Sequence, residues 1–142
     1  MDRVFLDANL LFSAAYKPDS HLLDLWALPD TEVVTSELAF EEARRNLAAR
    51  GPDRVGALDE LRARTRVTGD TRIPTHLLED VALPDKDRPI LAAALAVGCT
   101  HLLTGDRRHF GALCGRTIAG VLVLTPAEYF RRRRSAGRRR RA

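Results

Sequence analysis

Short apolar segments typical of β-strands alternate with helical segments along most of this chain, and this order limits the fold more than any other feature. Strands are predicted at residues 4–6, 32–35, 66–68, 101–104 and 120–125. Helices are predicted at residues 9–15, 20–28, 36–50, 53–64 and 91–97, with a short one ending near residue 81 and a last one starting at Pro126. Strands separated by helices pair in parallel, with helices on both faces of the sheet. The sequence therefore predicts an α/β fold, a three-layer α/β/α sandwich with a mainly parallel central sheet.

Length and apolar content indicate a single domain. A chain of 142 residues with 45% hydrophobic residues can build one core and is too short for two. The longest unbroken apolar run, residues 90–97, is far below the roughly 20 residues of a membrane span. Residues 1–15 lack the pattern of a secretory signal, and the two cysteines, Cys99 and Cys114, match no metal spacing. We therefore expect a soluble, cytoplasmic protein that does not bind membranes.

The positive charge of the chain is concentrated at its C-terminus. Residues 131–142 hold eight arginines and no acid, and subtracting these eight charges from the net charge of +4 leaves −4 for residues 1–130. We therefore expect a domain over residues 1–130 and an arginine-rich, disordered tail over residues 131–142. Such a tail can neutralise phosphates in a salt-dependent way, or it can be a solvated terminus without a partner.

Two acidic residues follow predicted strands. Asp7 interrupts the apolar stretch RVFLDANLLF directly after the first strand, and Asp106 comes two residues after the strand that ends at residue 104. Ligands of open parallel sheets bind beyond the carboxyl ends of the strands, so both carboxylates are expected at that edge. Asn9 would add a neutral oxygen or amide close to Asp7.

Two further acids lie on predicted helices. Glu42 borders the apolar stripe of the helix at residues 36–50, and we expect it to be half-buried, whereas Glu41 lies further toward water. Asp87 precedes or opens the helix that contains residues 91–97, and the N-terminal amides of a helix favour an anion. Both acids can therefore face the same edge of the sheet as Asp7.

A cluster of carboxylates at this edge would call for a cation, because like charges repel one another. Oxygen ligands without His or Cys suit Mg²⁺ or Mn²⁺ better than zinc, and such a metal can activate water for in-line attack on a phosphate ester. Ser36 and Thr104 stand beside predicted site acids and can support them by hydrogen bonds.

Each acid also has a simpler interpretation. The three aspartates, Asp7, Asp87 and Asp106, can be caps of helices or turns, which is the commoner role of Asp after a strand. Glu42 can be an exposed partner of Arg45 or Asn46 on its own helix. Their joint occurrence on so short a chain favours the metal site.

Four motifs in this order resemble the PIN-domain family, small metal-dependent nucleases that include the VapC-type toxins of toxin–antitoxin pairs. The motifs are LDANLLFSA, VTSELAFEEARRNL, DKDRPILAAAL and CTHLLTGDRRHFG, and a final GVLVLTPAEY extends the resemblance over about residues 3–125. The resemblance implies metal ligation by Asp7, Glu42, Asp87 and Asp106 and RNA as the substrate. It also implies a homodimer and a small antitoxin as partners.

The chain departs from this family at one point. Many members carry a further Asp shortly after the position of Asp106, where this chain has Arg107, Arg108 and His109. Whether a second metal binds is therefore open. His109 can approach the phosphate or the leaving group, or it can be a structural residue beside Phe110.

The segment SHLLDLWAL, residues 20–28, is apolar on nearly all sides when it is wound as a helix. One face can cover the core, and another can contact a partner chain. A fully buried helix explains the same pattern.

The sequence as a whole predicts a Mg²⁺- or Mn²⁺-dependent endoribonuclease of the PIN type, which hydrolyses RNA phosphodiester bonds as the toxin of a toxin–antitoxin pair. The alternative is a PIN-like module that binds nucleic acid or protein without catalysis. A phosphoryl-transfer domain fits less well, because a haloacid-dehalogenase-type phosphatase has a second Asp where this chain has Asn9.

Overall fold

The computed structural model describes residues 1–69, 88–105 and 113–141, with side chains described up to residue 137. Its described strands are β1 (Asp2–Leu6), β2 (Thr31–Ser36), β3 (Arg66–Thr68), β4 (His101–Leu103), β5 (Thr117–Ile118) and β6 (Val121–Leu124). They form one sheet in the order β3-β2-β1-β4-β6-β5, in which only β5 pairs antiparallel. The predicted α/β class with a mainly parallel sheet is confirmed. The two-residue strand β5 was not predicted.

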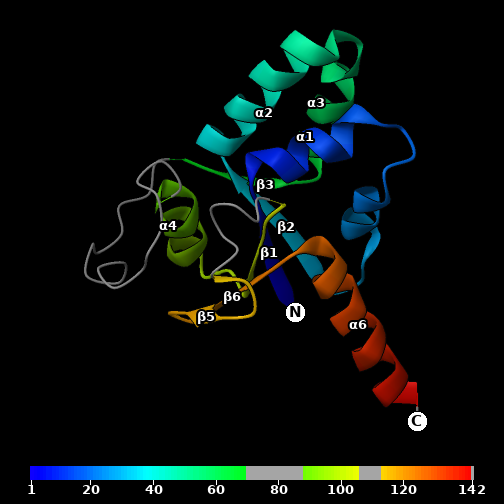
Figure 1. Cartoon of the computed structure of the whole chain (residues 1–142), viewed down its shortest axis with the longest axis vertical. Helices are drawn as coiled ribbons and strands as arrows, with labels where there is room; N and C mark the ends of the chain where they lie inside the picture. Colours follow the sequence, from blue (N-terminus) through cyan, green and yellow to red (C-terminus); the bar gives the residue numbers. More distant parts are fainter. Residues whose placement is uncertain (70–87, 106–112, 142) are drawn as a thin grey trace.

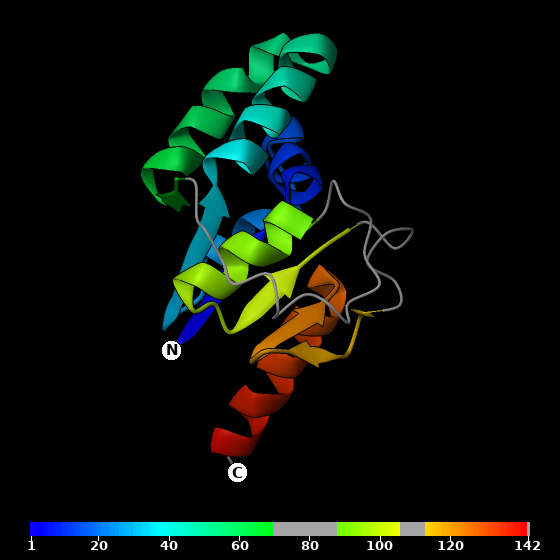
Figure 2. The same ribbon diagram turned by 90° about the vertical axis from the view of Figure 1, so that its left-hand side faces the viewer.

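Helices cover both faces of this sheet (Figures 1 and 2). The described helices are α1 (Ala8–Tyr16), α2 (Glu37–Arg50), α3 (Val55–Ala63), α4 (Arg88–Val97) and α6 (Pro126–Arg141), with the 3-10 helices η1 (His21–Ala27) and η2 (Pro52–Arg54). The short helix predicted near residue 81 lies outside the described residues. Within the described parts of the chain, no helix combines the length and apolarity of a membrane span.

Alternate residues of β1, β2, β4 and β6 supply two separate cores. On β1, Val4 and Leu6 pack with α1, η1, α2, α3 and Tyr129 of α6. Phe5 lies between them in sequence and packs on the other face, against α4. Such alternation is expected where both faces of a parallel sheet are buried, and it fixes the register of the strands.

Local capping residues start the helices that follow the strands. The Ser36 hydroxyl accepts a hydrogen bond of 3.1 Å from the Ala39 amide and caps α2. The Thr125 hydroxyl accepts one of 3.3 Å from the Glu128 amide, and Pro126 occupies the first position of α6. These caps start a helix directly after β2 and after β6.

The segment at residues 20–28 differs from its prediction. It forms the 3-10 helix η1 rather than an α-helix, and Leu22 and Leu25 are buried. Trp26 packs against the same core, and its indole nitrogen donates a 2.9 Å hydrogen bond to the Thr65 hydroxyl. These contacts favour the interpretation that the core, rather than a partner chain, takes up the apolar residues of the segment.

The arginine-rich segment also differs from its prediction, because residues 131–141 continue α6 instead of forming a disordered tail. A buried residue, Tyr129, ties α6 to the sheet by donating a 2.8 Å hydrogen bond to Asp2. Arg133 lies 3.2 Å from the same carboxylate and donates to the Pro29 carbonyl at 2.7 Å. Burial opposes ionisation of Asp2, but the hydrogen bond from Tyr129 and the nearby positive charges lower its pKa overall.

Candidate metal site

Polar residues form a row across the carboxyl ends of the parallel strands. The pairing register places Thr68 of β3 opposite Ser36 of β2. It also aligns the last residues of β1, β4 and β6, so that the next residues, Asp7, Thr104 and Thr125, lie side by side. Neighbours in register project from the same side of a parallel sheet, so the strands deliver oxygen atoms to one edge.

Asp7 is the buried carboxylate of this row. Its side chain is only 3% exposed. One carboxylate oxygen, Oδ1, accepts a 3.0 Å hydrogen bond from the Leu10 amide and thereby caps α1. The other, Oδ2, accepts a 2.7 Å hydrogen bond from the Thr104 hydroxyl. The cap and the neighbouring strand together fix the orientation of the carboxylate.

The exit from β4 is held close to Asp7. The Thr104 amide donates to the Leu124 carbonyl at 3.1 Å, which continues the pairing with β6 beyond the strand. A Cβ atom at Gly105 would lie 3.3 Å from the Leu10 side chain. Glycine therefore allows the chain after β4 to pass close to α1.

Glu42 is exposed, and the prediction that it is half-buried is wrong. The buried stripe of α2 consists of Ala39, Phe40, Ala43 and Leu47, which leaves Glu42 on an outer flank of the helix. Within the described residues Glu42 makes no hydrogen bond or ion pair. Asn9, the second residue of α1, is exposed as well.

Asp87, Asp106 and His109 lie outside the described residues. Within residues 1–69, 88–105 and 113–141, no three His, Cys, Asp or Glu side chains are grouped closely enough to hold a metal. The convergence of the four predicted acids therefore stays a prediction. What the structure does bring together is Asp7, its hydroxyl donor Thr104 and the cap Ser36, on neighbouring strands at one edge.

A comparison with known families decides what kind of domain this is. Residues 3–108 match the sequence model of the PIN domain. The chain belongs to the PIN-domain family. No curated protein sequence matches the chain significantly.

Two solved structures that share this fold contain VapC-type proteins. One is the crystal structure of VapBC2 from Rickettsia felis bound to a DNA fragment from its promoter. A chain of that structure matches with a TM-score of 0.63 and 18% sequence identity, and the match covers 87% of the present chain and 98% of that chain. The other is VapC20 from Mycobacterium tuberculosis, described as a toxin that cleaves the Sarcin-Ricin loop. It matches with a TM-score of 0.57 and 20% sequence identity, and the match covers 77% of the present chain and 94% of VapC20. At this identity the likeness establishes the fold.

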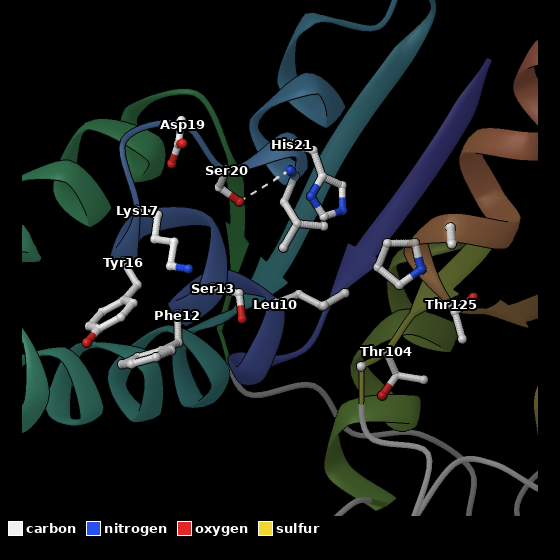
Figure 3. A pocket seen from close by; sticks show the side chains of 14 residues that line it. Leu10, Phe12, Ser13, Tyr16, Lys17, Asp19, Ser20, His21, Thr104 and Thr125 are labelled. Carbon is white, nitrogen blue, oxygen red and sulfur yellow. Dashed lines mark hydrogen bonds between the residues drawn. The ribbon is translucent and has the colours of Figure 1, made fainter.

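An open pocket of about 700 Å³ in this PIN domain includes Thr104, the hydrogen-bond donor to Asp7, among its lining residues (Figure 3). Thr104 and Gly105 line one part of it, together with the first residues of α6. The remaining wall comes from α1, from the loop after it and from the start of η1. Sequence reasoning missed the pocket residues Tyr16, Lys17 and His21, because a polar segment after a helix looks like any surface loop.

Proposed function

We propose that this PIN domain is a metal-dependent endoribonuclease and that Asp7, Glu42, Asp87 and Asp106 are the ligands of a Mg²⁺ or Mn²⁺ ion. The observation that carries the proposal is the buried Asp7 carboxylate, held at the carboxyl edge of the sheet by the Leu10 amide and the Thr104 hydroxyl. The two hydrogen bonds hold this carboxylate in one orientation at the edge. A carboxylate oxygen that accepts one hydrogen bond still has a lone pair for a cation, so this position suits a metal ligand.

The donor set fits a hard divalent cation. All four proposed ligands are carboxylates, and hydroxyl groups stand next to Asp7 in the polar row. Mg²⁺ and Mn²⁺ prefer such oxygen ligands. A bound cation of this kind would activate water and neutralise negative charge on the phosphate.

The residues of this chain have separate roles in the proposed reaction. Asp7 holds a fixed orientation because both of its oxygens accept hydrogen bonds. Thr104 acts as a positioning residue, because its hydroxyl contacts Asp7 and its amide continues the β6 pairing. The Glu42 side chain is exposed, so it can reach a metal ion at the edge without losing buried contacts.

RNA is the proposed substrate, and a toxin is the proposed biological role. VapC20 is described as cleaving the Sarcin-Ricin loop, which supports RNA as the substrate class. The VapBC2 complex supports an antitoxin as a partner of this chain. We retain the homodimer in the proposal on the basis of family resemblance. The non-catalytic binding module is the competing function.

Metal removal tests the proposed activity directly. We expect the purified chain to cleave single-stranded or structured RNA with Mg²⁺ or Mn²⁺, and to lose this activity in EDTA, because the chelator removes the cation proposed to activate water and to neutralise the phosphate. Isothermal titration with Mn²⁺ should show heat of binding. Full cleavage in EDTA would contradict the proposal, and RNA binding without either metal uptake or cleavage would favour the binding module.

The charge on the end of α6 gives a second prediction. Figure 1 shows α6 leading away from the end of the molecule that carries α2. Replacing the four arginines of residues 138–141 by glutamine leaves the anchor at Arg133 intact. We expect weaker RNA binding and a smaller dependence of affinity on salt, by up to about 3 in the log–log slope for single-stranded RNA. Electrophoretic mobility shifts at several salt concentrations measure this salt dependence. An unchanged log–log slope would mean that residues 138–141 do not contact RNA.

A further inference from the structure

The pocket beside Thr104 extends the candidate site in one direction. Thr104 lines it and donates a hydrogen bond to Asp7, so one wall of the pocket is in direct contact with the residue that carries the buried carboxylate, although Asp7 itself does not line the pocket. From there the pocket runs along α1 toward Tyr16 and Lys17 (Figure 3). A polymer cut beside Asp7 would therefore have its neighbouring unit in or over this pocket.

The far end of the pocket offers an aromatic surface. The rings of Phe12 and Tyr16 are stacked, with centroids 5.1 Å apart and planes inclined by 18°. Tyr16 is nevertheless 41% exposed, so part of its ring is accessible to a ligand. Exposed aromatic rings in nucleic-acid-binding proteins stack on unpaired bases.

The rim of the pocket carries groups that suit a sugar–phosphate backbone. Figure 3 shows the Lys17 side chain extending between Tyr16 and Ser13, where its ammonium group provides a compact positive charge. His21 lines the same pocket and is exposed. Ser20 lines it too, and its hydroxyl oxygen accepts a 3.3 Å hydrogen bond from the Leu22 amide. Asp19 is the single acid among the described lining residues.

We propose that this pocket binds one nucleotide of the RNA, next to the phosphodiester bond that is cut, with its base against Tyr16 and a phosphate beside Lys17. The inference rests on the proposed function, because it assumes that nucleic acid lies along the carboxyl edge. The volume of about 700 Å³ falls within the range of roughly 300–1,000 Å³ that small-ligand pockets have.

Binding of a short fluorescein-labelled single-stranded RNA in EDTA tests the pocket without cleavage. Fluorescence anisotropy should show that Tyr16→Leu weakens binding by about 5- to 100-fold, the loss typical of one base stack. Tyr16→Phe keeps the ring and should bind like the unchanged chain. Lys17→Ala should weaken binding and lower its salt dependence by about 0.7 in the log–log slope for one phosphate contact.

Arg116→Ala is the matched control for Lys17→Ala. Arg116 is exposed and precedes β5 at the edge of the sheet, and its removal changes the net charge by the same amount. We expect the Arg116 variant to retain both affinity and salt dependence. Equal losses for Lys17 and Arg116 would show that only overall charge matters and would overturn the pocket assignment.

Cleavage of the same RNA in Mg²⁺ separates failure of the pocket assignment from failure of the proposed function. If the unchanged chain cleaves RNA while the Tyr16 and Lys17 variants bind as well as it does, the pocket assignment is wrong and the nuclease stands. If the unchanged chain neither binds nor cleaves RNA, both are wrong. Thermal denaturation checks that the variants fold. If Tyr16→Leu is unstable, the comparison of Lys17→Ala with Arg116→Ala still tests whether the pocket binds RNA.

Discussion

Replacing Asp7 by Asn is expected to lower RNA cleavage by about 100- to 1,000-fold while leaving the fold intact. The loss follows from removal of a carboxylate charge at the proposed metal, which contributes several kcal/mol of transition-state stabilisation. The fold should persist because an Asn side-chain oxygen can accept the hydrogen bond from the Leu10 amide, and Asn caps helices about as well as Asp. Steady-state cleavage of a labelled RNA and circular dichroism measure the two effects.

Asp7→Ala serves as the structural contrast to this substitution. Alanine removes the cap of α1 and leaves the Thr104 hydroxyl without the carboxylate to which it donates. We expect a loss of about 1–3 kcal/mol in the free energy of unfolding. A stable Asp7→Asn variant with undiminished cleavage would show that this carboxylate is only a helix cap, which is the simpler interpretation of the sequence.

Most of the fold could be predicted because its signals are local. The apolar segments around Phe5 and Leu102 mark strands, and Ser36 and Pro126 mark the starts of the helices α2 and α6. A strand that ends in a polar residue and is followed by a helix also places that residue at the carboxyl edge. Asp7 was predicted at this edge from such a pattern alone, and the structure finds it buried there.

The burial of α2 was predicted less well, because helical periodicity defines a stripe without fixing its centre. A spacing of 100° per residue places Leu38 in one stripe with Ala39, Ala43 and Leu47 and puts Phe40 at the margin, but Leu38 is 54% exposed and Phe40 is buried. The buried face of α2 is therefore turned toward Phe40, and contacts of this helix with α3 account for the difference. The Arg62 guanidinium of α3 lies 4.5 Å from the centre of the Phe40 ring and pairs with Glu37 at 2.8 Å. Such contacts between helices cannot be read from either helix alone.

The helical structure of the arginine-rich segment likewise depends on contacts with residues far away in the sequence. Composition suggests solvation, because eight like charges repel one another. Arginine is nevertheless a good helix former, and Tyr129 and Arg133 attach α6 to Asp2 at the other end of the chain. The pocket likewise combines α1, η1 and α6, so no single stretch of sequence carries its signal.

Glu42→Gln is expected to lower cleavage by about 10- to 100-fold or more, and it offers the sharpest test of the four-acid site. The side chain is exposed and makes no hydrogen bond or ion pair with the described residues. Its substitution should therefore change the free energy of unfolding by less than about 0.5 kcal/mol. A loss of activity could then be attributed to metal binding, which Mn²⁺ titration would show as a weaker affinity.

Glu41→Gln provides the matched control, because Glu41 is the preceding residue on α2, is also exposed and carries the same charge. We expect this variant to cleave RNA and bind Mn²⁺ like the unchanged chain. The prediction extends to Asp87→Asn and Asp106→Asn, which should reproduce the loss seen for Glu42→Gln if the four acids share one cation. Equal activity of the Glu41 and Glu42 variants would show that Glu42 is not a metal ligand. If neither Asp87→Asn nor Asp106→Asn lowers activity, Asp7 lacks the further ligands that a divalent ion requires, and the four-acid site is wrong.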